Sequence, residues 1–223
     1  MKLIGVTGGV GSGKSEILQY MKRQYNCRIL MADDAARALE APGGAVYEPL
    51  VALLEEYGGG RTHREISGEK LSGAEVPCEN ILLADGRINN QEMARRIFSR
   101  PELLEKVNAL VHPAVKKYIL DEFRKEEEAG SYSFFVIEAA LLIECGYGNI
   151  VDSMWYIYCE PMERRRRLKA SRGYSDEKID NIMRSQLGED LYRQNSDVVI
   201  DNSGALEDSC RQVDEAMRKM GEA

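Results

Sequence analysis

The segment Gly8-Gly9-Val10-Gly11-Ser12-Gly13-Lys14-Ser15 lies close to the start of this chain of 223 residues and matches the pattern GxxxxGK[ST] in full. The β-rich run Leu3–Thr7 precedes it, and helical periodicity follows it from Ser15 to Gln24. A strand, a glycine-rich turn and a helix in this order are the context in which the pattern binds phosphate. We therefore predict a phosphate-binding loop over residues 8–15.

The residue types of this loop suit a nucleoside triphosphate and a divalent cation. Glycines let backbone N–H groups approach phosphate oxygens without obstruction by Cβ, and the helix N-terminus adds partial positive charge. Lys14 can reach the β- and γ-phosphates, and the Ser15 hydroxyl is the expected ligand of Mg²⁺. We expect ATP and Mg²⁺ as ligands. The residues predicted to bind them are Thr7, Gly8, Gly9, Val10, Gly11, Ser12, Gly13, Lys14, Ser15 and Glu16.

Short apolar runs alternate with longer helical patterns along the chain, which predicts a parallel sheet covered by helices on both faces. Further strands are expected at Arg28–Ala32, Ser133–Glu138, Met154–Cys159 and Asp197–Ile200. Together with Leu3–Thr7 they make five strands. The predicted fold class is α/β: a three-layer P-loop NTPase fold with a parallel five-stranded sheet, a helical substrate-binding insert and a helical lid.

The long stretch between the second and third strands shows helical periodicity at Gln91–Phe98, Glu102–Leu110 and Ala114–Glu128. We interpret this stretch as an inserted helical subdomain, in which Gly58–Asn80 is a glycine-rich loop or a small hairpin. The expected parts are a nucleotide-binding core of residues 1–40 and 131–205, the helical subdomain of residues 41–130, a lid of residues 161–190 within the core, and a C-terminal helix of residues 206–223.

Composition limits the class of protein. Hydrophobic residues make up 43% of the chain, and its formal net charge of −7 argues against a broad surface for nucleic acid or acidic membranes. None of the five cysteines has CxxC spacing, which indicates reduced thiols rather than a zinc site or disulfides. The apolar start is too short for a signal peptide or a membrane span. We predict a cytoplasmic protein that is a monomer or a weak homo-oligomer.

Two acidic residues follow predicted strands, at the edge where parallel sheets bind their ligands. Asp33 could accept the proton of a substrate hydroxyl beside the γ-phosphate, or it could only cap the following helix. Glu138 could support Mg²⁺ through water, or it could lie at the surface as an ordinary acid at a strand end. We predict Asp33 as the catalytic carboxylate and keep Glu138 as a candidate metal-supporting residue.

A dense cationic cluster consists of Arg164–Arg167, Lys169 and Arg172. Several members of such a run face water or pair with nearby acids such as Glu163. Guanidinium groups also stabilise the negative charge that spreads over a transferring phosphoryl group. Arg172 lies beside the flexible Gly173 and suits a lid that closes over ATP. We predict Arg172 as the catalytic arginine, with a neighbour at residues 164–169 as the alternative.

Beyond the loop, the sequence resembles the dephospho-coenzyme A kinases over nearly its whole length. Val6-Thr7-Gly8-Gly9 followed by the phosphate loop is similar to the opening of that family. His112-Pro113 and Ile200-Asp201-Asn202 are more discriminating, because many families share the phosphate loop alone. The segments that resemble the family in the same order are Ala32-Asp33 with Ala36-Arg37, Asp85-Gly86, Ile97-Phe98, Asn108–Pro113, Leu141–Glu144 and Val199–Gly204.

This resemblance implies one P-loop kinase unit over residues 1–223. It implies ATP-dependent phosphorylation of the ribose 3′-hydroxyl of dephospho-coenzyme A, which is the last step of coenzyme A synthesis. The partner is then this small molecule, bound by a coenzyme A-binding helical subdomain at residues 41–130.

By position, the resemblance makes Asp33 the catalytic carboxylate and Arg172 the arginine of the lid, with Lys14 acting on the phosphates. A single histidine such as His112 is more often a packing or capping residue than a ligand. The candidate substrate-binding residues carried over from the resemblance are Arg37, His112 and Glu144.

The chain departs from the family pattern at several places. Met31 stands where a second acid is usual, Asn90 where an arginine usually follows Asp-Gly, and Ala140 where a proline is usual. The stretch between the basic helix and Gly173 is about one residue long, so Lys169 and Arg167 are alternatives for the lid residue. Gly58–Asn80 resembles an insertion. None of these departures removes a group that phosphoryl transfer requires.

Two other functions share part of this pattern. A nucleoside or nucleoside-monophosphate kinase would have the loop and the lid, but not the segments around His112 and Asn202. A GTPase switch would have a DxxG element, which Asp201–Gly204 matches. That element should precede a guanine-reading Asn-Lys-x-Asp, and this chain has no such tetrapeptide.

Overall fold

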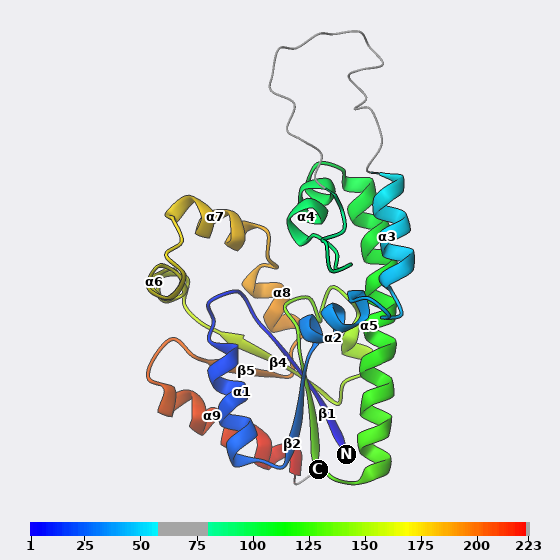
Figure 1. Cartoon of the computed structure of the whole chain (residues 1–223). Helices are drawn as coiled ribbons and strands as arrows, with labels where there is room; N and C mark the ends of the chain where they lie inside the picture. Colours follow the sequence, from blue (N-terminus) through cyan, green and yellow to red (C-terminus); the bar gives the residue numbers. More distant parts are fainter. Residues whose placement is uncertain (58–79, 222–223) are drawn as a thin grey trace. The chain divides into compact units, whose positions relative to one another are not determined.

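The computed structural model describes residues 1–57 and 80–221, which divide into two compact units, Met1–Ala32 with Ile119–Ala223 and Asp33–Tyr118 (Figure 1). The strands are β1 (Lys2–Thr7), β2 (Cys27–Met31), β3 (Phe134–Glu138), β4 (Ser153–Tyr158) and β5 (Val198–Asp201). The helices are α1 (Lys14–Gln24), α2 (Ala32–Glu40), α3 (Tyr47–Glu56), α4 (Asn90–Phe98), α5 (Pro101–Ala129), α6 (Pro161–Arg172), α7 (Asp176–Arg184), α8 (Glu189–Gln194) and α9 (Leu206–Gly221), with a 3-10 turn η1 (Tyr147–Asn149).

The first unit contains a sheet of five parallel strands in the order β2-β3-β1-β4-β5. Val6 of β1 lies opposite Glu138 of β3 and Trp155 of β4, and Met31 of β2 lies opposite Glu138 as well. The carboxyl ends of the three strands β1, β2 and β3 therefore meet at one edge of the sheet. The glycine-rich loop leaves the sheet at this edge, where parallel sheets bind their ligands.

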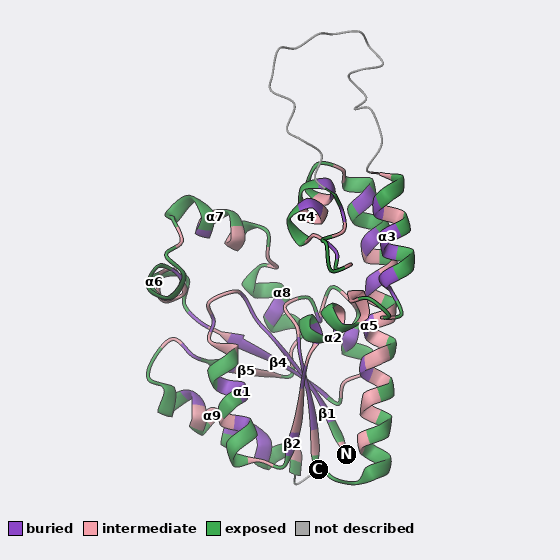
Figure 2. Cartoon of the chain, in the orientation of Figure 1, coloured by how far each residue is buried: buried purple, intermediate pink, exposed green. Residues whose placement is uncertain are grey.

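One face of the sheet packs against α1 and α9 in an apolar core. Ile4, Val6, Trp155 and Ile157 are fully buried there, because every second residue of a strand points to the same face. Figure 2 shows β1 and β4 buried along most of their length. The near-continuous apolar runs in the sequence thus correspond to strands that are covered on both faces.

The opposite face of the sheet is covered by aromatic contacts from two helices. Phe123 of α5 meets Phe135 of β3 edge to face, with ring centroids 5.7 Å apart. Tyr192 of α8 stacks on Tyr156 of β4 at 4.7 Å, and burial raises the pKa of Tyr156 to about 12. Helices on both faces of one parallel sheet confirm the predicted three-layer α/β fold.

The second unit, Asp33–Tyr118, is mostly helical. It consists of most of α2, all of α3 and α4, the first part of α5, and an isolated antiparallel bridge between Leu82 and Ile88. Asn89 caps α4, because its side-chain oxygen accepts hydrogen bonds from the backbone N–H groups of Gln91 and Glu92. The apolar side chains buried in its two longer helices are Tyr47, Leu50, Val51, Leu54, Leu103, Val107, Val111 and Val115.

The two helices expected at Glu102–Leu110 and Ala114–Glu128 are a single helix, α5, of 29 residues. The expectation was wrong because it stopped the first helix before Pro113, which lacks an N–H group and usually ends or kinks a helix. Buried apolar residues continue at every fourth position from Leu103 to Ile119. Burial of that stripe offsets the hydrogen bond that the proline removes.

The other differences between expectation and structure are small. Each expected strand agrees with the observed one to within one residue at either end, but β2 ends at Met31 and Asp33 lies in the first turn of α2. The short helix α8 was not expected, because six residues give too little periodicity to detect. The predicted loop at Gly58–Asn80 lies outside the described residues, apart from Asn80 itself.

A buried ion pair lies within α4, and its arginine connects that helix to α3 of the same unit. Glu92 and Arg96 are 3% and 6% exposed, and Arg96 Nε lies 2.6 Å from Glu92 Oε1. Arg96 also donates a hydrogen bond to the carbonyl oxygen of Leu54 at 2.7 Å. Hydrogen bonds from Arg95 and Arg96 lower the pKa of Glu92 to about 2. The carboxylate is therefore charged at neutral pH, and its guanidinium partners balance that charge.

We expect Arg96→Met to lower the free energy of unfolding by about 3 kcal/mol, because it leaves a buried carboxylate without one of its partners. Arg95→Met is the matched control, since the Arg95 side chain is 47% exposed, and it should cost about 1 kcal/mol or less. Urea denaturation of both variants measures the difference.

The same ion pair predicts a pH dependence. The lowered pKa of Glu92 contributes stability above its usual value of 4.5, and this contribution is lost as the pH falls toward about 2. The difference in the free energy of unfolding between Arg96→Met and the parent protein should therefore become smaller as the pH falls. Equal costs for Arg96→Met and Arg95→Met at neutral pH would contradict this account.

Candidate active site

The phosphate loop follows β1 and leads directly into α1 at Lys14. Gly13, the last residue before the helix, has φ +86°, a left-handed conformation that favours glycine. A Cβ atom at Gly13 would lie 2.2 Å from Nδ2 of Asn202. Both the backbone conformation and the packing therefore require glycine at this position.

Asn202 supports the loop from the far end of the chain. Its side chain is buried after β5, and Nδ2 donates a hydrogen bond to the carbonyl oxygen of Ser12 at 2.8 Å. Its amide oxygen accepts a hydrogen bond from Oγ of Ser209 at 2.9 Å, and its own carbonyl accepts one from Arg167 at 2.9 Å. The discriminating segment Ile200-Asp201-Asn202 thus has a structural role, which is to fix the phosphate loop.

The Lys14 ammonium lies at the loop itself. Nζ donates a hydrogen bond to the carbonyl oxygen of Gly8 at 2.7 Å and lies 3.4 Å from Oε1 of Glu138. The two charged side chains are only 13% and 10% exposed. The structure therefore brings together the predicted phosphate-binding lysine and the predicted metal-supporting acid, which lies at the end of β3 as expected.

The hydroxyl groups around the loop have different environments. The Thr7 hydroxyl donates to the carbonyl oxygen of Ala140 at 3.3 Å and so links β1 to the segment after β3. Oγ of Ser12 is buried without a hydrogen-bond partner among the described residues. An unsatisfied hydroxyl inside a glycine-lined loop fits a phosphate ligand, which would supply acceptor oxygens. Ser15 and Glu16 are exposed in the first turn of α1.

Two arginines of α6 contact the phosphate loop. Nε of Arg164 donates to the carbonyl oxygen of Val10 at 3.1 Å, and Nη1 of Arg167 lies 3.5 Å from that of Ser12. Both belong to residues 164–169, the predicted alternatives to Arg172, and Arg167 was a specific alternative for the lid. Their spacing of three, followed by the buried Leu168, marks one face of a helix. The two arginines between them, Arg165 and Arg166, pair instead with Glu163, Asp176 and Asp180.

Arg172, the predicted arginine of the lid, is the last residue of α6 and is exposed. Gly173 follows it as the C-cap with φ +61°. The guanidinium carbon of Arg172 lies 5.8 Å from the ring centroid of Tyr174, and its hydrogen bond, together with the charge of Lys178, lowers the pKa of Tyr174. In this structure Arg172 thus contacts its own helix end, whereas Arg164 and Arg167 contact the loop.

The predicted catalytic carboxylate, Asp33, belongs to the second unit. It is exposed in the first turn of α2, where the positive end of the helix favours a carboxylate. Its neighbour Asp34 accepts a hydrogen bond from Arg37 at 2.6 Å, and both of those side chains are mostly exposed. The two adjacent acids therefore differ, since Asp34 is paired with an arginine of the next turn.

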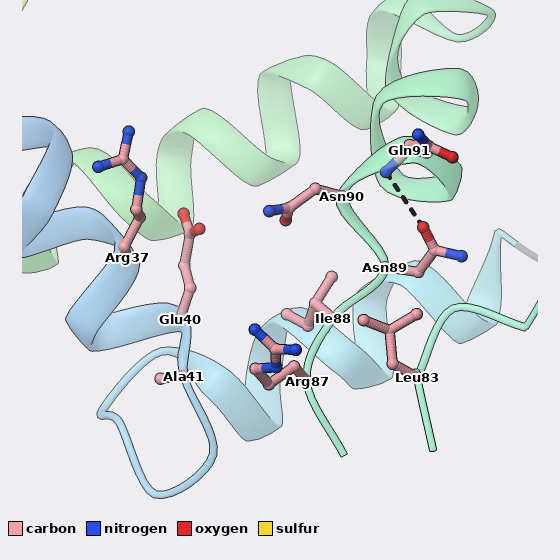
Figure 3. A pocket seen from close by; sticks show the side chains of 9 residues that line it. All are labelled: Arg37, Glu40, Ala41, Leu83, Arg87, Ile88, Asn89, Asn90 and Gln91. Carbon is pink, nitrogen blue, oxygen red and sulfur yellow. Dashed lines mark hydrogen bonds between the residues drawn. The ribbon is translucent and has the colours of Figure 1, made fainter. Parts of the chain in front are cut away.

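A pocket of about 540 Å³ lies within the second unit (Figure 3). Its wall combines two guanidinium groups and three side-chain amides with a few apolar side chains, which suits a large polar and anionic ligand. The lining residues are Arg37, Glu40, Ala41, Leu83, Arg87, Ile88, Asn89, Asn90 and Gln91.

The pocket also contains the position at which the sequence departs from the family pattern. Asn90 lines it in place of the usual arginine, and Arg87 supplies a guanidinium three residues earlier, where it pairs with Asp85 at 2.6 Å. Burial raises the pKa of Glu40 against the opposing effect of Arg37. Of the candidate substrate-binding residues, the structure thus places Arg37 in this wall.

The other two candidates lie elsewhere. His112 is half-buried within α5 and is not among the residues that line the pocket. Glu144 belongs to the first unit, where it is exposed. Burial raises the pKa of Tyr192 in that unit, and the charge of Glu144 adds to this effect. Of the three candidates, only Arg37 lines the described pocket.

Comparison with known proteins decides the family. The family model for dephospho-CoA kinase matches residues 2–208. The chain belongs to the dephospho-CoA kinase family. It is a P-loop kinase that transfers phosphate from ATP to dephospho-CoA, in the last step of coenzyme A synthesis. This membership sets aside the nucleoside kinase and GTPase alternatives.

Individual relatives agree with the assignment to the dephospho-CoA kinases. The chain is 30% identical over 219 residues to the dephospho-CoA kinase of Streptococcus mutans, covering 98% of each chain. A crystal structure of a Thermus thermophilus protein matches with a TM-score of 0.73 and 27% identity, over 98% of this chain and 97% of the other. The dephospho-CoA kinase of Campylobacter jejuni shares the fold, with a TM-score of 0.65 and 18% identity over 100% and 98% of the two chains.

In residues 1–57 and 80–221, no helix combines the length and the apolar character that crossing a bilayer requires.

We expect Asn202→Ala to weaken ATP binding, because it removes the hydrogen bond that holds the Ser12 carbonyl and leaves a gap beside Gly13. The loss of one buried hydrogen-bonded amide should also lower the unfolding free energy by about 2 kcal/mol. Calorimetric titration with ATP and urea denaturation measure the two effects. The control is Asn195→Ala, an exposed amide that bonds only to the carbonyl of Leu191. ATP affinity equal to that of the parent protein in Asn202→Ala would contradict the supporting role.

Proposed function

We propose that the loop at residues 8–15 holds the triphosphate of ATP and that Lys14 binds its β- and γ-phosphates. The observation that carries this proposal is the position of Lys14 Nζ, which lies inside the loop on the Gly8 carbonyl. Phosphate oxygens would offer this ammonium stronger, charged acceptors than a backbone carbonyl does. The glycine at position 13 makes room for Asn202, which fixes the loop backbone that would bind these oxygens.

Mg²⁺ fits the same site. Oxygen ligands are the ones that Mg²⁺ prefers, and the Ser15 hydroxyl together with the Glu138 carboxylate, acting through water, would hold it. When bound, the ion neutralises negative charge on the phosphates. The partly buried carboxylate of Glu138 beside Lys14 supports this assignment, because both groups lie at the strand edge from which the loop departs.

We assign Asp33 as the carboxylate that accepts the proton of the ribose 3′-hydroxyl. As the hydroxyl oxygen bonds to the γ-phosphorus, the bond from that phosphorus to the bridging oxygen breaks and ADP leaves. Arginines of α6 would stabilise the charge on the transferring group; Arg164 and Arg167 already contact the loop, and Arg172 remains the candidate of the lid. Support for Asp33 comes from its place two residues beyond the end of β2.

We further assign the pocket of the second unit to dephospho-CoA. The substrate carries a pyrophosphate, and Arg37 and Arg87 offer guanidinium groups that can bind phosphate oxygens in pairs. Asn89, Asn90 and Gln91 add amide groups for neutral polar parts of the ligand. A cytoplasmic location and a monomeric or weakly associating state remain predictions of the sequence.

The expected result for Asp33→Asn is a fall in turnover of at least about 100-fold with unchanged ATP affinity, because an amide cannot accept the proton. A coupled assay for ADP and a separate ATP titration measure the two quantities. Asp34→Asn, at the adjacent acid, is the matched control for turnover at saturating dephospho-CoA, since its partner Arg37 is proposed to bind that substrate. Near-normal turnover of Asp33→Asn would discard the assignment.

The pocket yields a second prediction. Arg87→Met should raise the KM for dephospho-CoA about tenfold and leave the KM for ATP unchanged, because one charged hydrogen-bonding partner of the substrate is lost. Arg95→Met removes a guanidinium from the same unit outside the pocket and should change neither value. An equal rise in both KM values for Arg87→Met would contradict the assignment of this pocket to dephospho-CoA.

A single comparison tests the proposed function as a whole. The purified protein is assayed with ATP and dephospho-CoA, with common nucleosides and nucleoside monophosphates in parallel. We expect phosphorylation of dephospho-CoA alone. Phosphorylation of a nucleoside but not of dephospho-CoA would overturn the proposal.

A further inference from the structure

Gln186 contacts the phosphate loop at Val10 and has no role in the proposed phosphoryl transfer. Its side-chain oxygen accepts a hydrogen bond from the backbone N–H of Val10 at 3.3 Å and one from Nη2 of Arg164 at 2.6 Å. Nε of Arg164 in turn donates to the carbonyl oxygen of Val10 at 3.1 Å. The three residues thus form a closed ring of hydrogen bonds, which we call the Val10 latch.

The chemistry of the partners fixes the orientation of the Gln186 amide. Both neighbouring groups, the Val10 N–H and the Arg164 guanidinium, are donors, so only the amide oxygen can face them. A carboxylate could accept the same two hydrogen bonds, and more strongly from the guanidinium. A shorter or apolar side chain could not. Glutamate should therefore preserve the hydrogen bonds of the latch, whereas asparagine or leucine should lose them.

The latch holds both polar groups of the Val10 backbone: Gln186 accepts from its N–H group, and Arg164 donates to its carbonyl oxygen. The adjacent Gly9 leaves room for this arrangement, since a Cβ atom there would lie 2.3 Å from Nη2 of Arg164. Val10 is only half-buried and lies in the middle of a glycine-rich segment, which has high conformational freedom when it is not held. The latch removes that freedom before a ligand arrives.

Both ends of one chain segment contribute to the latch. Arg164 is in the first turns of α6, and Gln186 comes two residues after the end of α7. The two residues are 22 positions apart in sequence and meet at Val10. The loop and the base of the α6–α7 segment are therefore fixed to each other by side-chain hydrogen bonds, within the first unit.

We infer that Gln186 is a positioning residue for ATP, which acts through Val10 to keep the phosphate loop in its binding conformation. The inference rests on the proposed binding of ATP at residues 8–15 and adds a residue that contacts no substrate. A preorganised loop loses less conformational entropy when it binds the triphosphate. The role of Gln186 is then specific to ATP and does not extend to dephospho-CoA.

The test compares substitutions of Gln186 in the full-length protein by calorimetric titration with Mg²⁺ and ATP, without dephospho-CoA. Gln186→Leu removes both hydrogen bonds and is expected to raise the Kd for ATP about tenfold. Gln186→Asn keeps the amide but is one methylene too short, so it should weaken binding in the same way. Gln186→Glu preserves both acceptor sites and should stay within about twofold of the parent protein.

The control variant is Arg211→Met, which removes an exposed guanidinium of α9 that pairs with Asp208 of the same helix. Its ATP affinity should equal that of the parent protein. Steady-state assays of all variants should show a raised KM for ATP in Gln186→Leu and Gln186→Asn, with the KM for dephospho-CoA unchanged.

Two outcomes would overturn the inference. One is parental ATP affinity in Gln186→Leu or Gln186→Asn, and the other is a loss in Gln186→Glu as large as in Gln186→Leu. Thermal melting of each variant identifies a general loss of structure, and Gln186→Asn remains informative if the apolar replacement does not fold. Failure of the proposed function would appear separately, as a parent protein that binds ATP in the calorimeter but does not phosphorylate dephospho-CoA.

Discussion

A phosphate loop must keep its backbone open to the ligand and yet hold a fixed shape, and here distant side chains meet that requirement. The loop has few side chains of its own, since glycine occupies positions 8, 9, 11 and 13. Asn202 holds the Ser12 carbonyl from the end of β5, and Arg164 of α6 holds the Val10 backbone together with Gln186, which follows α7. The glycines therefore serve two purposes, because they admit the phosphates and also admit these supporting groups.

The sequence was sufficient for the loop and the sheet, because both depend on local patterns. GxxxxGK[ST] between a strand and a helix carries its own chemistry, and apolar runs located all five strands to within a residue. It was insufficient for the supports of the loop, since Asn202 and Ser12 are 190 positions apart and no local pattern links them. It also failed at Pro113, where burial of a long apolar stripe outweighed the local signal to end the helix.

The basic helix shows the same limit in a different form. A run of four arginines has nearly uniform charge, so composition cannot say which of them face the loop, and only the helical periodicity separates Arg164 and Arg167 from their neighbours. At the pocket of the second unit, in contrast, the sequence suggested a loss that the structure compensates. Asn90 looked like the loss of a substrate contact, but the structure places Arg87 in the same wall, so the pocket retains a second guanidinium beside Arg37.

Helix α5 contributes to both units, since its residues up to Tyr118 belong to one and those from Ile119 onward to the other. One strand-to-helix junction and one uninterrupted helix are thus the covalent links between them. Inserting a single residue into a helix rotates everything beyond it by about 100° and shifts it by about 1.5 Å. The length of α5 between Leu103 and Val115 is therefore fixed by phase within the second unit, because an inserted residue would turn part of the buried stripe toward solvent even where each individual side chain can be exchanged.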